Sequence, residues 1–140
     1  MIKKAIIKDL KPLFELENRV FPNDLFALSK KSFQYHILRN YLYIFKKDEK
    51  IVGYILWLER KEYFRLYSLG VDIGFQGIGI ASKLLEYSFK ELKNRNFSLE
   101  VKINNTKAIK LYEKFGFKIK KVLKSYYEGS DGYMMVKSRV

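Results

Sequence analysis

The glycine-rich turn between residues 71 and 81 constrains the fold of this chain more than any other feature. Residues 62–71 before it have the apolar pattern of a strand, and residues 80–95 after it place apolar side chains at helical spacing. A further apolar strand follows at 97–103. A strand, a helix and a strand in this order are expected to form a right-handed parallel crossover. We therefore expect a sheet that contains a parallel strand pair.

The remaining elements are predicted from apolar spacing and turn residues. Three strands, at 41–45, 51–58 and 62–71, are separated by short polar turns and are expected to pair antiparallel. The other predicted elements are a short first strand built on Ile2, Ile6 and Ile7, helices from Asp9 to Phe21, from Ser29 or Ser32 to Leu38 and from Thr106 to Phe115, and strands at 117–123 and 133–136. We therefore expect an α/β (mixed α+β) fold with a central mixed sheet of about seven strands and about four flanking helices.

The length of 140 residues is that of one domain, so we expect residues 1–140 to form a single domain. No apolar stretch reaches the ~18 residues that a membrane-spanning helix needs. The N-terminus returns to charged residues too early for a signal peptide. We therefore expect a cytoplasmic protein without a membrane partner.

The absence of cysteine excludes disulfides, thiolate catalysis and any cysteine-ligated metal. His36 is the only histidine, which makes a multi-histidine metal site or a catalytic triad unexpected. It is expected on the surface of its helix or in the core, and Trp57, in the middle of a strand, is expected in the core. We accordingly expect no metal site.

The charge is strongly basic, with 28 Lys and Arg against 15 Asp and Glu and a formal net charge of +13. Such a charge indicates an anionic partner without specifying which one. One concentration lies between Lys102 and Lys124, where Glu113 is the only acidic residue. These lysines are either a solvated face or part of a nucleic-acid-binding surface, and the sequence leaves both open.

The glycine turn has the chemistry of an anion site. Glycines allow positive φ and a close approach of the backbone, and the first turn of the following helix offers unpaired N–H groups and a positive dipole end. Phosphate is the most plausible anion. A P-loop is rejected because Ile80 and Ala81 stand where it needs Lys and Ser or Thr. A dinucleotide fingerprint is disfavoured because Ser82 fills the place of its third glycine and the turn follows an antiparallel run.

The segment from Gln76 to Ala81 matches the Q/R-x-x-G-x-G/A signature, so the chain resembles the GNAT superfamily of N-acetyltransferases. Further segments are similar to the ribosomal-protein-alanine N-acetyltransferases of RimI type. They are Leu99–Lys102, Asn105, Ala108, Leu111–Tyr112 and Gly116–Phe117, then Tyr126–Tyr127 with Met134–Met135, and near the N-terminus Glu17 with Phe21–Pro22. The resemblance covers nearly the whole chain.

The resemblance implies an acetyl-CoA-dependent N-acetyltransferase. It assigns Glu100 as the general base and Tyr112 as the general acid. Tyr126 and Tyr127 would wall the acceptor site. The implied cofactor-binding residues are Gln76, Gly77, Ile78, Gly79, Ile80 and Ala81 for the pyrophosphate, Leu69, Gly70 and Val71 for the pantetheine arm, and Asn105.

These assignments are chemically reasonable for an amine acceptor. An α-amino group has a pKa of ~8 against ~10.4 for lysine, so a carboxylate acting through water removes its proton at modest cost. A Tyr hydroxyl is a neutral donor for the departing sulfur. Because the chain has no cysteine, direct attack in a ternary complex is the simplest route. Lys83, Lys107 and Lys110 are plausible contributors to the field that attracts the cofactor phosphates.

Alternatives remain for the acceptor and for the residues. The sequence departs from the RimI pattern at Asn23–Asp24 and Asp131–Gly132, both near the family's acceptor site. The acceptor is therefore either a protein N-terminus, such as that of a ribosomal protein, or a small-molecule amine or lysine side chain. Glu59 and Glu62 compete with Glu100 as bases, and Glu100 and Tyr112 have purely structural alternatives. A basic nucleic-acid-binding module is the lower-ranked alternative function.

Overall fold

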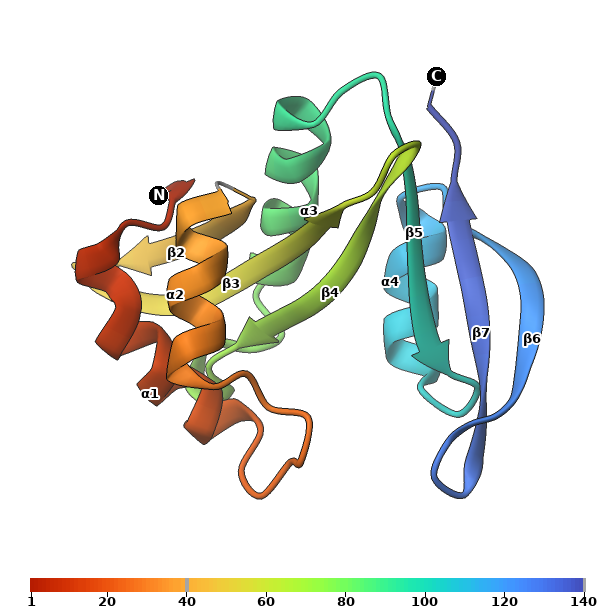
Figure 1. Ribbon diagram of the computed structural model, residues 1–140, viewed down its shortest axis with the longest axis horizontal. Coiled ribbons are helices and arrows are strands. Elements are labelled where there is room, and N and C mark those ends of the chain that lie inside the picture. The colour runs from red at the N-terminus through yellow and green to blue at the C-terminus, as the bar shows by residue number, and fades with distance from the viewer. Residues whose placement is uncertain (40, 140) are drawn as a thin grey trace. The chain divides into compact units, whose positions relative to one another are not determined.

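The structure is a computed structural model, and it describes residues 1–39 and 41–139 (Figure 1). The chain divides into two compact units. The first comprises residues 1–57 and 67–91, and the second comprises residues 58–66 and 92–140. Strand β4 (Tyr63–Val71) has its first residues in the second unit and its last in the first. The expectation of one domain over the whole chain stays a prediction.

The first unit packs helices on both faces of its strands. Its elements are β1 (Ile2–Lys4), a 3₁₀ turn (Ile7–Asp9), α1 (Leu10–Val20), α2 (Lys30–Arg39), β2 (Leu42–Lys47), most of β3 (Lys50–Glu59), the end of β4, a second 3₁₀ turn (Ile73–Phe75) and α3 (Ile80–Glu91). Both β1 with β2 and β2 with β3 pair antiparallel. Figure 1 shows α1 and α2 on one face of β2 and β3, with α3 on the other.

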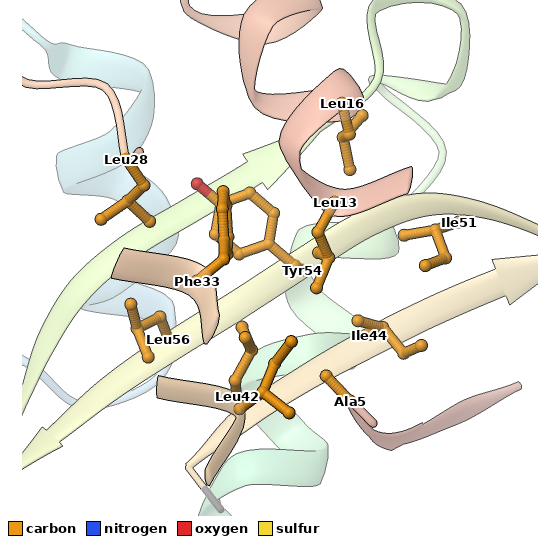
Figure 2. Close-up of a cluster of buried hydrophobic side chains, with 11 residues drawn as sticks. Ala5, Leu13, Leu16, Leu28, Phe33, Leu42, Ile44, Ile51, Tyr54 and Leu56 are labelled. Atoms are coloured by element: carbon orange, nitrogen blue, oxygen red, sulfur yellow. The ribbon is translucent and has the colours of Figure 1, made fainter. Parts of the chain in front are cut away.

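Strand alternation explains this layering, because successive side chains point to opposite faces. Tyr54 and Leu56 pack with Leu13, Leu16 and other residues of α1, α2 and β2 in a buried cluster (Figure 2). On the other face, Gly53 lies against Ile80 and Leu84 of α3, and the buried Trp57 donates its Nε1–H to Ser88 Oγ at 2.8 Å. The expectation that Trp57 belongs to the core is confirmed. Burial of each such large apolar side chain stabilises the fold by roughly 1.5–3 kcal/mol.

The second unit is built on strands with one helix. It contains the first residues of β4, β5 (Asn96–Lys102), α4 (Thr106–Lys114), β6 (Lys118–Tyr127) and β7 (Ser130–Lys137). β4 pairs parallel with β5 over Tyr63–Arg65 and Asn96–Ser98. β5 pairs antiparallel with β7, and β7 with β6. The parallel pair that the sequence predicted on either side of the glycine turn is confirmed.

The sheet order is β1-β2-β3-β4-β5-β7-β6, and with four α-helices it confirms the predicted fold class for the part of the chain that is described. No helix within the described residues is long and apolar enough to cross a membrane. Some predicted bounds were wrong. The first strand ends at Lys4, because Ile6 N–H donates to Asp9 Oδ2 at 2.8 Å and the chain enters a 3₁₀ turn. Helix α3 ends at Glu91 instead of near Arg95, and Asn94 has a φ of +65°.

The last hairpin is longer than predicted. Its strands run to Tyr127 and from Ser130, so Glu128 and Gly129 alone form the turn, with Gly129 at a φ of +73°. Asp131 Oδ1 accepts a hydrogen bond from Ser125 N–H at 2.8 Å, where the register of β6 against β7 shifts. This irregularity interrupts the apolar alternation, so the extension of β6 to Tyr127 was not predicted from the sequence.

Candidate active site

The predicted phosphate-binding turn leads from β4 into α3 within the first unit. Gly77 and Gly79 have φ values of +79° and +88°, a region that side-chain-bearing residues rarely adopt. All four residues from Gln76 to Gly79 are exposed. An ideal Cβ at either glycine would meet no described atom within 4 Å. The turn therefore leaves open space at the N-terminus of α3, as an anion cradle requires.

Hydrogen bonds hold this turn in shape. Gln76 Nε2 donates to the Val71 carbonyl at 3.0 Å, and Phe75 N–H donates to the Asp72 carbonyl at 2.8 Å. Asp72 is itself buried, and its carboxylate accepts a bond from Arg19 Nη2 at 3.1 Å. The amide nitrogen of Gln76 thus braces the turn by a bond to its backbone. The contribution from Arg19 was not predictable from the sequence, because Arg19 and Asp72 are 53 residues apart.

The residues predicted to pair with the pantetheine arm form the end of β4. Leu69, Gly70 and Val71 lie beyond Tyr63–Arg65, the residues of β4 that pair with β5. Gly70 also has a packing reason to be glycine, because a Cβ there would lie 2.8 Å from Tyr54 Cε1. Glycine at this position therefore does not by itself indicate a ligand.

In the second unit, Glu100 forms an ion pair with Arg65. Arg65 Nε donates to Glu100 Oε1 at 2.8 Å, and Arg65 Nη2 lies 2.6 Å from the same oxygen. The exposed fraction is 29% for the Arg65 side chain and 14% for the Glu100 side chain. Sequence reasoning missed Arg65. The signal is in the register, because Arg65 is paired with Ser98 and Glu100 is two residues along the same face of β5.

Tyr112 and Tyr127 are two phenols of the same unit that stay protonated at neutral pH. Burial, and then the neighbouring Tyr127, raises the pKa of Tyr112 to about 12. Burial, followed by Tyr126 and Glu100, raises the pKa of Tyr127 to about 12 against a lowering effect of Arg65. The ring of Tyr112 also packs edge-to-face on Phe117, with centroids 5.9 Å apart. Both hydroxyls are therefore available as neutral hydrogen-bond donors.

The neighbouring residues of the hairpin fix the Tyr127 ring. The Tyr126 ring packs against it edge-to-face at 5.0 Å, and Lys102 Nζ lies over it at 5.5 Å from its centroid. Gly132 lies under the ring, and a Cβ there would come within 2.8 Å of Tyr127 Cε2. The departure from the RimI pattern at Gly132 thus has a physical reason, because an alanine would displace this ring.

Asn105 caps α4 through its side chain. Its Oδ1 accepts a bond from Ala108 N–H at 3.3 Å, which is the contact of a helix N-cap. Contact of Asn105 with a cofactor stays a prediction. Lys107 and Lys110 on the same helix, and Lys83 on α3, are all exposed.

Residues 10–117 match the family model described as the acetyltransferase (GNAT) family, and this range is more than half of the chain. The chain belongs to the GNAT acetyltransferase family. The predicted family and enzyme class are confirmed.

The relatives that this chain resembles are N-acetyltransferases by name. The N-alpha-acetyltransferase of Saccharolobus solfataricus is 39% identical over 109 residues, and the match covers 64% of this chain and 64% of that protein, just under two thirds of its length. The ribosomal protein bS18-alanine N-acetyltransferase of Haemophilus ducreyi is 32% identical over 136 residues, which cover 94% of this chain and 92% of that protein. The structure of Arabidopsis thaliana Naa50 in complex with the bisubstrate analogue CoA-Ac-MVNAL has a TM-score of 0.81 at 29% identity and covers 99% of this chain and 97% of that one. These matches confirm the predicted RimI-type resemblance.

The predicted site residues of this GNAT enzyme fall in both units. Residues 69–71 and 76–81 belong to the first unit, whereas Glu100, Asn105, Tyr112, Tyr126 and Tyr127 belong to the second. Within the second unit, Glu100 is paired with Arg65, and Lys102, two residues further along the same face of β5, lies over the Tyr127 ring. The roles of all these residues in binding and catalysis stay predictions.

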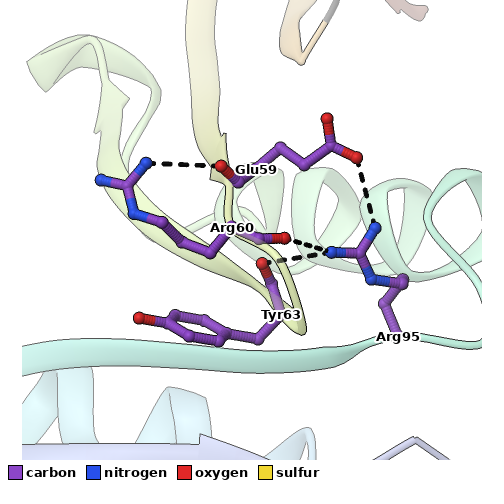
Figure 3. Close-up of polar contacts among 4 residues, drawn as sticks. All are labelled: Glu59, Arg60, Tyr63 and Arg95. Atoms are coloured by element: carbon purple, nitrogen blue, oxygen red, sulfur yellow. Dashed lines mark hydrogen bonds and ion pairs between the residues drawn. The ribbon is translucent and has the colours of Figure 1, made fainter.

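Glu59, one competing base in this GNAT chain, serves a structural contact. Arg95 Nη1 lies 3.3 Å from Glu59 Oε2, and Arg95 Nη2 donates to the carbonyls of Arg60 at 2.6 Å and Tyr63 at 3.4 Å (Figure 3). This network ties the turn between β3 and β4 to the start of β5. Within the described residues, no group of three or more carboxylates and histidines gathers as metal ligands do.

Proposed function

We propose that this GNAT enzyme transfers the acetyl group of acetyl-CoA directly to the N-terminal α-amino group of a protein. The observation that carries the proposal is the Glu100 carboxylate, mostly buried and anchored by Arg65, in the same unit as the phenols of Tyr112 and Tyr127. These groups match the needs of acetyl transfer, which are a proton acceptor for the amine and a neutral donor for the departing sulfur.

The turn from Gln76 to Ala81 fits the pyrophosphate of acetyl-CoA. Its exposed glycines, with positive φ and open space where Cβ atoms would lie, give a phosphate access to backbone N–H groups at the start of α3. We propose that Leu69–Val71 bind the pantetheine arm by strand-like pairing and that Asn105 contacts the same cofactor. Acetyl-CoA supplies the activated acetyl thioester, and the protein positions it.

Glu100 is the proposed general base. At neutral pH an α-amino group with a pKa of ~8 is mostly protonated, and the Glu100 carboxylate takes up its proton directly or through water. The neutral amine then attacks the thioester carbonyl. No acetyl-enzyme on a cysteine forms, because the chain has no cysteine.

Tyr112 is the proposed donor to the departing sulfur. Its pKa is raised to about 12. Complete proton transfer from such a phenol to a thiolate with a pKa of ~8.5 costs roughly 5 kcal/mol. Tyr112 therefore stabilises the developing negative charge by a hydrogen bond and keeps its proton. This refines the role of general acid that the family resemblance implies.

A protein N-terminus is the preferred acceptor. The relatives named N-alpha-acetyltransferase and ribosomal protein bS18-alanine N-acetyltransferase support it, as does Naa50 with its peptide-bearing bisubstrate analogue. A ribosomal protein is one such acceptor. The edge-to-face pair of Tyr126 and Tyr127 supports an acceptor wall, because rigid aromatic side chains bind a peptide with little loss of entropy.

An acceptor panel tests this function. The purified protein is incubated with acetyl-CoA and peptides that have either a free α-amine or a blocked N-terminus and a free lysine, and with small amines. We expect acetylation of the free α-amine, measured by mass spectrometry. The double variant Glu100→Gln, Tyr112→Phe should lose activity by roughly 10²-fold or more, with its circular dichroism unchanged. Acetylation of lysines or small amines alone would replace the proposed acceptor, and normal turnover by the double variant would refute the assigned roles.

A further inference from the structure

The contact between Arg65 and Glu100 joins the guanidinium to a single carboxylate oxygen. Nε and Nη2 of Arg65 both lie against Oε1, at 2.8 Å and 2.6 Å. Within the described part of the chain, Oε2 of Glu100 accepts no hydrogen bond. An arginine and a carboxylate frequently share both oxygens through two parallel bonds. Here one oxygen is anchored, and the other is left for a water or an amine.

We propose that Arg65 is a positioning residue for acetyl transfer, which holds Glu100 by Oε1 so that Oε2 is the atom that accepts the proton of the acceptor amine. This inference rests on the proposed role of Glu100 as the base. A hydrogen bond from Nε and a close ion-pair contact of Nη2 with the same oxygen restrict the rotation of the glutamate side chain, which otherwise has three flexible torsions. A fixed acceptor atom matters because small displacements of a reacting group cost large factors in rate.

The strand register places Arg65 where it can act. Arg65 is the last residue of β4 that pairs with β5, and its partner Ser98 is two residues before Glu100. The flanking Phe64 and Leu66 are buried and point to the opposite face, which anchors this part of β4. Arg95 also stacks on the Phe64 ring at 4.5 Å from its centroid. The backbone that carries Arg65 is therefore held by contacts within its own unit.

Charge compensation is the second consequence of the pair. The Glu100 side chain is mostly buried, and an unpaired carboxylate at that depth is costly. The guanidinium is permanently charged, so the pair presents no net charge to an arriving amine. An ammonium group therefore gains little from binding beside Glu100, and the neutral amine that performs the attack is not disfavoured. An α-amine reaches this form more easily than a lysine side chain.

A double-mutant cycle tests the proposal. The variants are Arg65→Gln, Glu100→Gln and the combination of both, assayed with acetyl-CoA and a peptide with a free α-amine. We expect Arg65→Gln to lower kcat by about 10- to 100-fold, with the KM for acetyl-CoA unchanged. In the Glu100→Gln background, Arg65→Gln should not lower kcat further, because the carboxylate that Arg65 positions is already absent. Arg65→Lys keeps the positive charge but offers one donor nitrogen in place of two. Its kcat should lie between those of Arg65→Gln and the wild type.

The control is Arg60→Gln, which changes another arginine of the same unit. The Arg60 side chain is exposed, donates to the Glu59 carbonyl at 3.3 Å and has no part in the proposed machinery. We expect kcat to stay within about twofold of the wild type, and all variants are compared by circular dichroism and acetyl-CoA binding. If Arg65→Gln does not fold, Arg65→Lys alone tests the proposal. A wild-type kcat in Arg65→Lys contradicts a role for the contacts of Nε and Nη2 with Glu100 Oε1.

The outcomes separate this inference from the proposed function. Wild-type kcat in Arg65→Gln, together with an inactive Glu100→Gln, overturns the role of Arg65 and leaves the function intact. The role of Arg65 is also overturned if the fold-losses in kcat of the two single variants multiply in the double variant. Arg65 would then act independently of Glu100. An active Glu100→Gln removes the proposed base and with it the role of Arg65. If Arg65→Gln lowers kcat in the wild-type background but not in the Glu100→Gln background, the result supports both the proposed base and the positioning role of Arg65.

Discussion

At the scale of single residues, Glu17 shows how burial gives a carboxylate a structural role. It is 2% exposed, and its Oε2 accepts a bond from Leu28 N–H at 2.7 Å, while its Oε1 accepts one from the Tyr54 hydroxyl. Tyr54 contacts Ser68 Oγ at 2.6 Å as well. The carboxylate thus connects α1 to the segment that precedes α2, and to β3 and β4. The family resemblance singled out Glu17, and only its surroundings show what it holds together.

The pH dependence of stability should report on Glu17. Burial raises the pKa of Glu17 above its ordinary value, against the lowering effect of its bonds to Leu28 and Tyr54. Its contribution to folding is therefore fully present below the pKa of the unfolded chain, and it decreases as the pH rises through the folded-state pKa. Glu17→Gln cannot ionise. We expect the stability of the wild type relative to this variant to be higher at pH 4 than at pH 8, measured by urea denaturation. A difference that is constant with pH, or that grows with pH, would contradict this assignment.

At the scale of elements, the turn between β4 and α3 depends on backbone conformation more than on side chains. Gly77 and Gly79 have positive φ, and Gln76 braces the turn through its side-chain amide. The glycine spacing predicted this element, because few other reasons place three glycines between a strand and a helix. The brace from Gln76 to the Val71 carbonyl was not predictable, since the type of turn fixes which carbonyl faces the amide.

Two glycines of this turn form a matched pair for testing its role. A Cβ at Gly74 or at Gly77 would meet no described atom within 4 Å, but only Gly77 has a positive φ. Gly77→Ala should therefore raise the KM for acetyl-CoA roughly tenfold, because left-handed backbone costs an alanine about 1–2 kcal/mol. Gly74→Ala should leave this KM nearly unchanged. Steady-state kinetics of the two variants checks this, and equal KM values would show that the conformation of Gly77 is not needed for cofactor binding.

At the scale of the whole molecule, positive charge is concentrated in the second unit. That unit carries fifteen Lys and Arg against six Asp and Glu, a formal +9 of the total +13. The lysines of β6, Lys118, Lys120, Lys121 and Lys124, are all exposed. The resulting field should attract the polyanionic acetyl-CoA from solution, although one cofactor does not require so large a charge.

Ionic strength should therefore act on cofactor capture. The screening length falls from roughly 30 Å at 0.01 M salt to about 8 Å at 0.15 M. We expect the KM for acetyl-CoA to rise several-fold over this range while kcat changes little, as measured by initial rates. A KM that is independent of salt would show that the excess charge serves another purpose. Salt-sensitive binding of an RNA oligonucleotide in the same buffers would favour the nucleic-acid alternative.

The sequence by itself determined the order of elements, the parallel pair around the glycine turn, the GNAT family and the residues that match its motifs. These features are local, because apolar periodicity and motif spacing operate within a few turns or strands of the chain. The tertiary structure decided the contacts between distant segments: Arg65 with Glu100, Glu17 with Tyr54, and Lys102 with the Tyr127 ring. Each depends on strand register or on the burial of one side chain against another, and neither is encoded in the spacing of residues along a single segment.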